Sequence, residues 1–567
     1  MWRQTYETWK NRTDLDPAVR QDLEDKSESE LEDMFYTSLA FGTGGLRGIV
    51  GAGTNRMNVY TVRKANEGLA RYLEDRYVPA ALARGVVIAH DNRAMSREFA
   101  EESARVFGAH GIRAYLFDAL RPTPELSFAV RDLGALAGIV VTASHNPPKY
   151  NGYKIYDEFG CQFTPRYADA IAAFVEAVED PFSIAVLDLP AMRRRGLLVP
   201  IGAEIDDRYL ARVKTVQLRP DAEKDVTIVF TPLHGTAAEL ATRLLTETGY
   251  AFATVPEQMV HDPAFGTVKS PNPENPEAFT LAIAKGKAVG ADLLVATDPD
   301  ADRLGVAVRE RDRYRLLTGN QTGAVLLDYL LSGLREQGRL PAQGVVFNTI
   351  VTSDLGAKIA RDYGLDVVST LTGFKFIGEQ ARFLEGTDRS FVFGYEESYG
   401  YVIKDFVRDK DSLQALLLAA EAANYWRARG KTLADRLEEL HGRYGTHLEA
   451  LHNVDLFGAE GAARIDRIVA SFRTDPPVSV AGLRVLARED YEESIRFEGP
   501  VRSPLALPKS NVMKFILDED GWFVLRPSGT EPKLKIYVGV VDSDPAQAKS
   551  RLDALSAELL ARVRTIA

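Results

Sequence analysis

The fold is decided by the stretch Ala137-Gly138-Ile139-Val140-Val141-Thr142-Ala143-Ser144-His145-Asn146-Pro147-Pro148. Its first five residues are a short apolar run of the kind that forms a buried strand, and the asparagine and two prolines prevent a helix from following at once. We therefore expect Ser144 on a tight loop at the exposed end of a strand. Catalytic groups are common on such loops, so its lone hydroxyl is a candidate nucleophile.

Two further strings define what this serine could do. Asp298-Pro299-Asp300-Ala301-Asp302-Arg303 follows another apolar run, and its three alternating carboxylates suit Mg²⁺, which is commonly bound beside a substrate phosphate. Arg526-Pro527-Ser528-Gly529-Thr530-Glu531-Pro532-Lys533 crowds a guanidinium, two hydroxyls and free backbone amides into one turn, which is typical of a phosphate cradle. Nucleophile, divalent metal and phosphate clamp together indicate phosphoryl transfer.

Five strings in a fixed order are similar to those of the alpha-D-phosphohexomutases. They are F-G-T-G-G-L-R-G at 41–48, T-A-S-H-N-P-P at 142–148, D-P-D-A-D-R at 298–303, G-Y-E-E-S-Y-G at 394–400 and R-P-S-G-T-E-P at 526–532. Each string alone is weak evidence, but their ordered co-occurrence is hard to obtain by chance. The first string and the tyrosine at 395 resemble the branch that holds bacterial phosphoglucomutases and animal phosphopentomutases.

The length of 567 residues exceeds one hydrophobic core, and about 150 residues per domain gives about four domains. Short apolar runs alternate with helical patterns, as in strand 86–89, helix 96–110, strand 114–117 and a short helix over 125–132. We predict an α/β fold of four domains around a central cleft, in which three similar α/β units with mixed sheets precede a smaller α+β domain. The domains are expected at 1–205 with the phosphoserine loop, 206–320 with the metal loop, 321–445 with the sugar loop and 446–567 with the phosphate loop.

The composition excludes several classes of partner. Acidic residues outnumber basic ones by 80 to 69, and the net charge of −11 argues against nucleic acid or an anionic membrane as a partner. The single cysteine, Cys161, fits a reducing compartment. Neither a signal-peptide pattern nor an apolar run of about 18 residues is present, so we expect a cytoplasmic protein. Basic side chains must then gather locally to bind an anionic substrate.

The resemblance implies a role for each catalytic residue. Ser144 would be carried as phosphoserine and would share one Mg²⁺ with Asp298, Asp300 and Asp302, while Arg303 adds positive charge. Lys154 and His145 are the candidates for general acid and base. Flanking arginines could lower the pKa of Lys154 and so suit it to this role, whereas taken alone it would be a solvated charge. His145 could instead serve only to order the loop. Arg47, in a glycine-rich turn, resembles the family's arginine beside the phosphoserine.

Substrate binding is also assigned by resemblance. Glu396 and Ser398 would bind the sugar hydroxyls, although a solvated acidic turn is otherwise the commoner interpretation of this pattern. Phe374 departs from the tryptophan often found at its position in glucose-specific relatives, which leaves the identity of the sugar open. The remaining predicted substrate contacts are Thr372, Gly373, Lys375, Arg408 and Lys410, with Arg526, Ser528, Gly529 and Thr530 for the phosphate that is not transferred.

Two other interpretations of the aspartates fit less well. An EF-hand calcium loop needs Gly and Glu where Arg303 and Arg309 stand. A haloacid-dehalogenase phosphatase also places D-x-D after a strand, but it needs Thr or Val near Ala301 and Asp302.

The resemblance therefore implies a Mg²⁺-dependent phosphoglucomutase that interconverts glucose 1-phosphate and glucose 6-phosphate through a glucose 1,6-bisphosphate intermediate. Its partners would be small sugar phosphates, and the protein would be a monomer or homodimer. Phosphopentomutase activity on ribose or deoxyribose 1-phosphate and phosphomannomutase activity are the alternatives. A sugar-phosphate-binding regulator without turnover is the alternative from another class.

Overall fold

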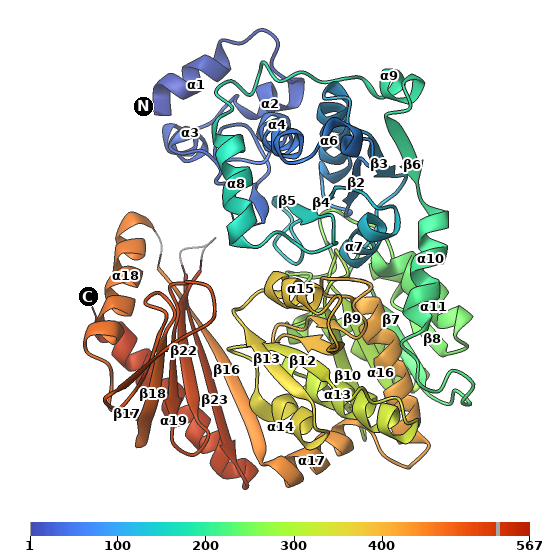
Figure 1. Cartoon of the computed structure of the whole chain (residues 1–567), viewed down its shortest axis with the longest axis vertical. Helices are drawn as coiled ribbons and strands as arrows, with labels where there is room; N and C mark the ends of the chain where they lie inside the picture. The colour runs from blue at the N-terminus through green and yellow to red at the C-terminus, as the bar shows by residue number, and fades with distance from the viewer. Residues whose placement is uncertain (1, 43, 457, 529–532, 567) are drawn as a thin grey trace. The chain divides into compact units, whose positions relative to one another are not determined.

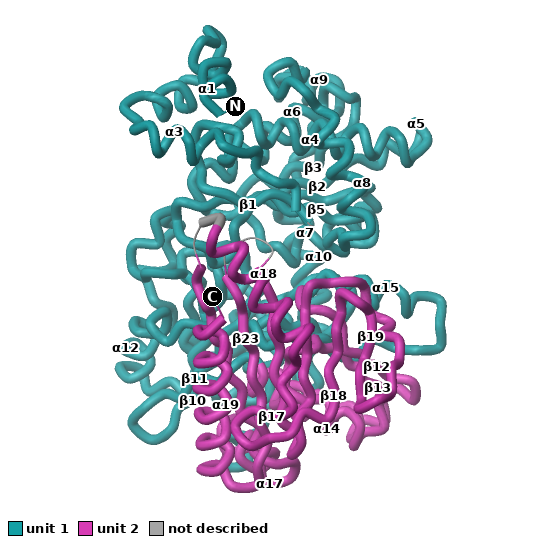
Figure 2. The backbone as a smooth tube through the Cα atoms, turned by 90° about the vertical axis from the view of Figure 1, so that its left-hand side faces the viewer, with its two compact units in different colours: residues 1–319, 374–430 teal, residues 320–373, 431–567 magenta. Residues whose placement is uncertain are grey.

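The structure is a computed structural model that describes residues 2–42, 44–456, 458–528 and 533–566 (Figure 1). The chain divides into two compact units (Figure 2). Unit 1 comprises residues 1–319 and 374–430, and unit 2 comprises residues 320–373 and 431–567.

Unit 1 begins with three short helices, α1 (Trp2–Lys10), α2 (Pro17–Asp22) and α3 (Glu28–Phe35). Ser27 begins α3 with a capping box, in which its side chain and that of Glu30 satisfy each other's backbone amides. The helices close over a small apolar core that contains Trp9 and Phe35, whose rings meet edge to face at 5.6 Å.

The first sheet has six strands in the order β1-β5-β4-β2-β3-β6. Their bounds are β1 (Gly45–Ile49), β5 (Tyr150–Asp157), β4 (Ala137–Val141), β2 (Val86–His90), β3 (Ala114–Phe117) and β6 (Leu198–Ile201). The β1-β5 and β5-β4 pairs are antiparallel and the others parallel, so the predicted mixed sheet is confirmed. Every residue of β2 and β4 is buried, as expected for central parallel strands.

Helices cover this sheet in two groups. Helix α6 (Ser96–Ala109) packs with α4 (Val59–Arg76), which packs in turn with α8 (Pro165–Glu176), while α7 (Thr123–Asp132) packs with α10 (Ala203–Lys214). Helix α7 begins two residues before the predicted start, because Pro124 occupies its first turn, where a missing amide costs nothing. This shift makes Thr123 the first helical residue.

The second sheet follows the same plan, in the order β11-β10-β9-β7-β8. Its strands are β7 (Thr227–Thr231), β8 (Ala251–Thr254), β9 (Leu293–Thr297), β10 (Leu304–Glu310) and β11 (Arg313–Leu317). Helices α11 (Ala237–Glu247) and α12 (Thr280–Val289) pack against it, and α16 (Ser412–Arg427) lies against β9 and β10. Helix α16 lies within the range 321–445 expected for the third domain, yet it packs against strands of the second sheet.

The strands of the third α/β region belong to both units. In unit 2, β12 (Gly344–Thr349) pairs in parallel with β13 (Asp366–Thr370), accompanied by α13 (Gly319–Glu336) and α14 (Asp354–Asp362). In unit 1, β14 (Ser390–Tyr395) pairs antiparallel with β15 (Tyr401–Val402), and α15 (Phe374–Phe383) precedes them. Strands β4, β9 and β14 each turn directly into an antiparallel partner, and this shared step supports the predicted structural repeat.

The last part of unit 2 is a sheet with two long helices. Its strands follow the order β16-β23-β22-β21-β18-β19-β20, with β17 paired to β18. They are β16 (Thr446–Asp455), β17 (Ser479–Val480), β18 (Leu483–Asp490), β19 (Ile495–Glu498), β20 (Val501–Pro504), β21 (Met513–Leu517), β22 (Trp522–Pro527) and β23 (Lys533–Asp542). Helices α18 (Gly458–Thr474) and α19 (Pro545–Thr565) complete this region, which confirms the predicted α+β character of the last domain.

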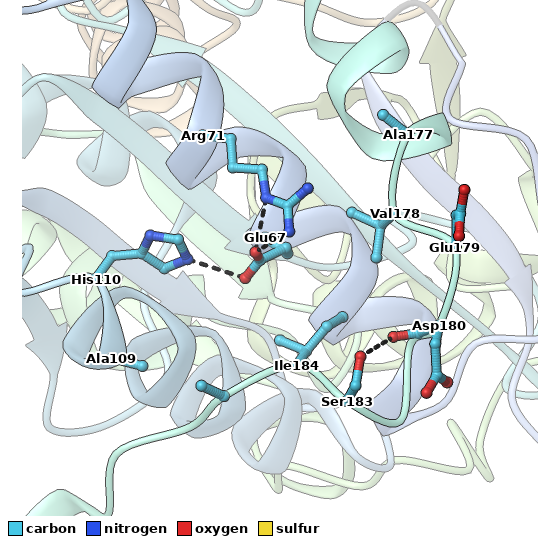
Figure 3. Close-up of a pocket in the computed structure, with 11 residues that line it drawn as sticks. Glu67, Arg71, Ala109, His110, Ala177, Val178, Glu179, Asp180, Ser183 and Ile184 are labelled. Carbon is cyan, nitrogen blue, oxygen red and sulfur yellow. Dashed lines mark hydrogen bonds and ion pairs between the residues drawn. The ribbon is translucent and has the colours of Figure 1, made fainter.

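A cavity of about 530 Å³ lies in the first domain, between α4, the end of α6 and the segment that follows α8 (Figure 3). His110 lines it and contacts Glu67 through Nε2 and Glu74 through Nδ1, both at 2.9 Å. Burial lowers the pKa of His110, but the two carboxylates outweigh burial and the net shift is upward. His110, just after α6, therefore ties the end of that helix to two glutamates of α4.

Within the described residues, we find no helix with both the length and the apolar character that crossing a bilayer requires.

Candidate active site

The serine loop connects β4 to β5, as the apolar run and prolines predict. Ser144 is 4% exposed and has a φ of +51°, a left-handed conformation that is unusual for a residue with a side chain. Its backbone amide donates to the hydroxyl oxygen of Thr142 at 2.8 Å. The loop thus holds the serine in a strained, fixed orientation, as is common at functional sites.

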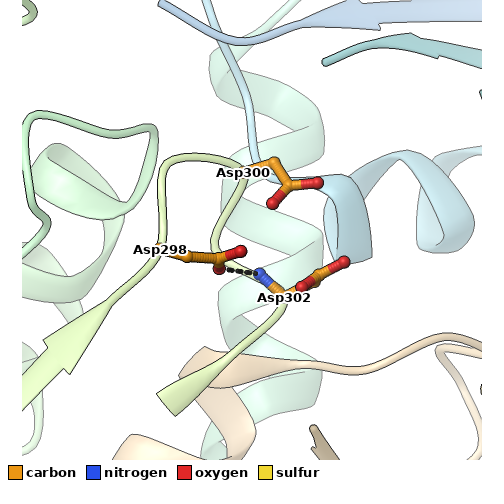
Figure 4. A group of neighbouring side chains, drawn as sticks. All are labelled: Asp298, Asp300 and Asp302. Carbon is orange, nitrogen blue, oxygen red and sulfur yellow. Dashed lines mark hydrogen bonds between the residues drawn. The ribbon is translucent and has the colours of Figure 1, made fainter. Parts of the chain in front are cut away.

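The aspartate loop occupies the equivalent position in the second sheet, between β9 and β10. The three carboxylates of Asp298, Asp300 and Asp302 are buried and offer ligand atoms within 4.8 Å of one another (Figure 4). Asp298 Oδ1 accepts the backbone amides of Asp302 and Arg303 at 3.1 and 3.0 Å. This bonding closes the loop into a tight turn and orients its carboxylates.

The chemistry of this carboxylate set fits a hard cation. In the described part of the chain, Asp300 Oδ1 and Asp302 Oδ1 are buried without a hydrogen-bond partner, which is costly for carboxylate oxygens that bind nothing. Burial raises the pKa of Asp298, and the neighbouring Asp300 and Asp302 carboxylates raise it further. The triad is therefore a site able to bind a metal, and oxygen ligands favour Mg²⁺ or Ca²⁺.

The serine and aspartate loops meet. Ser144 Oγ donates to Asp298 Oδ2 at 2.7 Å and lies 3.2 Å from Nδ1 of His145. Burial lowers the pKa of His145 well below its usual range, and the guanidiniums of Arg303 and Arg47 lower it further. The imidazole beside the serine oxygen is therefore neutral.

Two lysines neutralise the aspartates. Lys154 on β5 donates to Asp300 Oδ2 at 2.7 Å and to Asp302 Oδ2 at 3.3 Å. Lys410 lies 3.1 Å from Asp302 Oδ2, and Gly400 makes room for its stem, because a Cβ there would stand 2.2 Å from Lys410 Cδ. Burial lowers the pKa of Lys154, but Asp300 and Asp302 outweigh burial and raise it. The expectation that arginines would lower this pKa was wrong, because the groups nearest to the ammonium are carboxylates.

Arg47 reaches the serine loop from a strand and not from the predicted turn. It lies on β1 opposite Gly152 of β5, and its Nη1 donates to Asn146 Oδ1 at 3.2 Å. Strand β1 begins at Gly45, which has a φ of +137° and whose added Cβ would stand 1.7 Å from the carbonyl oxygen of Tyr153. Glycine is required there because the two strands approach so closely.

Unit 1 also holds six of the residues predicted to bind substrate, among them Lys410, described above. Arg303 pairs with Glu274, and Glu396 and Ser398 lie in the turn from β14 to β15, buried and half-buried respectively. Lys375 is in the first turn of α15.

Arg408 is fully buried and ion-paired to Glu385, with Asp405 at 3.8 Å. Arg408 is thus held by carboxylates of the protein itself, and its predicted contact with substrate stays a prediction.

Unit 2 holds the remaining predicted residues. Thr372 and Gly373 precede α15, and Arg526 and Ser528 lie at the end of β22. Ser528 donates its amide to the carbonyl of Lys533 at 2.8 Å, which closes the base of the phosphate loop. The predicted contacts Gly529 and Thr530 lie outside the described residues.

Thr123 belongs to this site and was missed by sequence reasoning. Its hydroxyl donates to Asp300 Oδ2 at 3.0 Å, and its amide donates to the Asp300 carbonyl at 2.9 Å. The signal was the string Arg121-Pro122-Thr123-Pro124, because prolines beside a threonine mark a helix start whose free amides favour an anion. The first domain thus orients a carboxylate of the second.

Comparison with known proteins identifies the family. Profiles described as phosphoglucomutase/phosphomannomutase match residues 38–181 (alpha/beta/alpha domain I), 207–311 (domain II), 318–444 (domain III) and 486–555 (C-terminal domain). The chain belongs to the phosphoglucomutase/phosphomannomutase family. The prediction from the five strings, an alpha-D-phosphohexomutase of four domains, is confirmed.

Members of the phosphoglucomutase/phosphomannomutase family resemble the chain over nearly its whole length. The phosphoglucomutase of Staphylococcus aureus strain MRSA252 is 38% identical over 556 residues, which cover 97% of this chain and 98% of that protein. The phosphoglucomutase of strain MSSA476 is 39% identical over 541 residues, covering 94% and 95%.

Solved structures share the fold. A phosphoglucomutase/phosphomannomutase family protein from Burkholderia thailandensis has a TM-score of 0.67 at 20% identity, covering 93% of this chain and 98% of that one. The phosphoglucomutase parafusin from Paramecium, in an open form, has a TM-score of 0.66 at 17% identity, covering 93% and 95%.

Proposed function

We propose that this protein is a Mg²⁺-dependent phosphoglucomutase that interconverts glucose 1-phosphate and glucose 6-phosphate through a phosphoserine at Ser144. The observation that carries the proposal is the 2.7 Å hydrogen bond from Ser144 Oγ to Asp298, since it joins the nucleophile to the buried carboxylate triad. The full-length likeness to phosphoglucomutases supports the choice of glucose.

The residues of unit 1 divide the work of phosphoryl transfer. In one direction the bond between phosphorus and Ser144 Oγ breaks while a sugar hydroxyl bonds to phosphorus. The sugar hydroxyl gives up one proton and the departing Oγ takes up one, so the step balances, and the reverse step restores both bonds. The attacking and leaving oxygens lie in line on opposite sides of phosphorus, so His145, 3.2 Å from Oγ, serves the serine side. Lys154 holds its proton beside Asp300 and can return it to an oxygen that leaves phosphorus.

Mg²⁺ bound by Asp298, Asp300, Asp302 and the serine phosphate would supply charge neutralisation for the transferred group. The residues fit such an ion because two of their buried oxygens make no other hydrogen bond among the described residues. Lys410 and Arg303 complete the balance of charge around the carboxylates.

The end of the β22-β23 hairpin is proposed to hold the phosphate that is not transferred. Arg526 on β22 stands directly opposite Lys535 on β23, so two cations share one face of the sheet. Like charges in such a pair repel, and a bound anion would turn this repulsion into attraction. Release and reversal of the bisphosphate would then let either end of the sugar phosphate reach Ser144.

We also propose the domain limits 1–205, 206–320, 321–445 and 446–567, which the four profile matches support. Sugar recognition by Glu396 and Ser398 belongs to the same proposal. A phosphopentomutase or a phosphomannomutase would use the same phosphoryl chemistry, so the sugar must be decided by measurement.

The test compares turnover of the 1-phosphates of glucose, mannose and ribose by the full-length protein, with Mg²⁺ and the matching bisphosphate present. We expect the highest kcat/KM with glucose 1-phosphate, loss of turnover in Ser144→Ala, and one added phosphate on Ser144 by intact mass and peptide mapping. Higher kcat/KM with another sugar would overturn the choice of glucose. An active Ser144→Ala variant, or release of inorganic phosphate at the rate of isomer formation, would overturn the mutase.

A further inference from the structure

Arg93 holds the serine loop from inside the first domain. It follows β2, and its side chain is completely buried. Nη2 donates to the carbonyls of Ser144 and Asn146, both at 2.5 Å, and Nη1 donates to those of Pro147 and Tyr150 at 3.0 and 3.1 Å. One guanidinium therefore binds four carbonyls that span the loop, and one of them belongs to the nucleophile itself.

The guanidinium is itself oriented by a carboxylate. Asp91 Oδ2 lies 3.3 Å from Arg93 Nε, and Asp91 Oδ1 accepts the Arg93 amide at 2.9 Å and the Ser96 hydroxyl at 2.6 Å. Ser96 Oγ in turn accepts from the side chain of Asn151, which lies on the strand leaving the serine loop. Residues after β2 thus bind both the serine loop and the start of β5, the strand that follows it.

The second domain covers the face of this guanidinium. The ring of Phe265 lies 4.9 Å from the Arg93 guanidinium carbon, within the range of a cation–π contact. Phe265 is fully buried and meets the ring of His234 edge to face. Asn92 donates to the carbonyl of Asp262, so the same turn is fastened to the segment that carries Phe265.

The serine loop needs such a support. A left-handed conformation at a non-glycine residue such as Ser144 persists when its surroundings over-determine it. Carbonyls of a buried loop also require donors, and the loop's own turn supplies few, such as the Asn146 amide to the Ala143 carbonyl at 3.1 Å. The planar fork of an arginine offers five donors in fixed directions, which a lysine cannot reproduce.

We propose that Arg93 is a positioning residue that holds Ser144 in line for phosphoryl transfer by clamping the four carbonyls of its loop. Arg93 acts through the loop and does not itself touch substrate. The inference rests on the proposed function, since it assigns Arg93 to the Ser144 reaction. It also predicts that the cost of losing the clamp falls on the chemical step, because misplacement of a reacting group by about 1 Å can cost about 100-fold in rate.

The experiment compares Arg93→Lys, Arg93→Gln and Arg93→Ala with the control Arg63→Gln. Arg63 pairs with Glu102 between α4 and α6 of the same domain, away from the serine loop. Each variant is measured for kcat and KM with glucose 1-phosphate and for amide hydrogen exchange of peptides covering residues 142–150 and 86–90. Guanidinium chloride at low millimolar concentration is added to Arg93→Ala as a chemical rescue.

We expect kcat of all three Arg93 variants to fall about 100-fold at nearly unchanged KM, with faster exchange in 142–150 and unchanged exchange in 86–90. Guanidinium should restore part of the activity of Arg93→Ala, and Arg63→Gln should turn over like the wild type. Wild-type kcat in Arg93→Lys, unchanged exchange of the loop, or equal loss in Arg63→Gln would overturn the clamp. If the wild type interconverts no sugar phosphate, the proposed function fails, and loop exchange in the folded variants still decides whether Arg93 clamps the loop.

Discussion

Replacing Asp298 by Asn should stabilise the fold while it abolishes turnover. Asparagine has the same shape, its carbonyl can still accept the amides of Asp302 and Arg303, and its NH₂ group can donate to Ser144 Oγ. The substitution therefore removes a charge without disturbing the loop. Asp298 lies beside the like charges of Asp300 and Asp302 in a fully buried site.

The size of the effect follows from the separation of the carboxylates. Two unit charges 4.8 Å apart repel by about 3.5 kcal/mol at an effective dielectric constant of 20, and the triad atoms lie within that distance. Asp298 takes part in two such pairs, and attraction by Arg303 offsets part of the sum. A net gain of about 2–4 kcal/mol from Asp298→Asn is therefore expected in EDTA, and it should raise the Tm by several degrees.

Addition of Mg²⁺ should reduce or remove the stability advantage of Asp298→Asn over the wild type. Ligand at 100 times its Kd stabilises a protein by about 2.7 kcal/mol, and the wild type should gain this while Asp298→Asn gains little. Turnover of the variant should fall by more than the roughly 100-fold that losing a supporting residue of a metal site costs. Thermal unfolding in EDTA and in Mg²⁺, together with the glucose 1-phosphate assay, measures both effects.

An Asp→Asn substitution at a paired carboxylate serves as the control and should lower the Tm instead of raising it. Asp328 makes two hydrogen bonds of 2.8 Å to the guanidinium of Arg436, so Asp328→Asn removes a paired charge and should lower the Tm equally in EDTA and Mg²⁺. If Asp298→Asn lowers the Tm in EDTA, or keeps wild-type turnover, the electrostatic account of the triad is wrong.

Three further outcomes are expected. The two glutamates beside His110 raise its pKa in the folded state, so the stabilisation they give is complete below the unfolded pKa of about 6.5 and is lost as pH rises through the folded value. The difference in free energy of unfolding between the wild type and His110→Gln, measured by urea titration, should therefore shrink from pH 6 to pH 9. A constant difference would contradict this. Gly45→Ala should destabilise the first domain by about 3 kcal/mol or more, because it strains a positive φ and meets a backbone oxygen, and an unchanged Tm would contradict this. Arg526→Ala should raise the KM for glucose 1-phosphate about 10- to 100-fold while phosphoserine formation at Ser144 persists, and an unchanged KM would remove Arg526 from the phosphate clamp.

Much of the local structure could be predicted from the sequence because its signals are local. Strands β3 and β4 match the apolar runs 114–117 and 137–141. The Ser144 and Asp298 loops follow their strands as predicted, because each apolar run ends in residues that forbid a helix.

Contacts between distant segments could not be predicted in this way. The partner of Lys154 is set by how β5 carries it beside the aspartate loop, so a charge expected to meet arginines meets carboxylates. Thr123 carries only the general signal of a helix start and Arg93 carries no motif, and their roles depend on contacts with loops 177 and 51 residues away. Such pairings are properties of the tertiary fold.

The three α/β regions place their chemistry at one recurring topological slot, the reversal from a central strand into its antiparallel neighbour. That slot holds the proposed nucleophile after β4, a carboxylate trio after β9 and a candidate sugar-recognition turn after β14. Each of the three loops can therefore be substituted separately from the other two. A change of preference to another hexose or pentose would then require substitutions in the turn after β14, with the loops after β4 and β9 left unchanged.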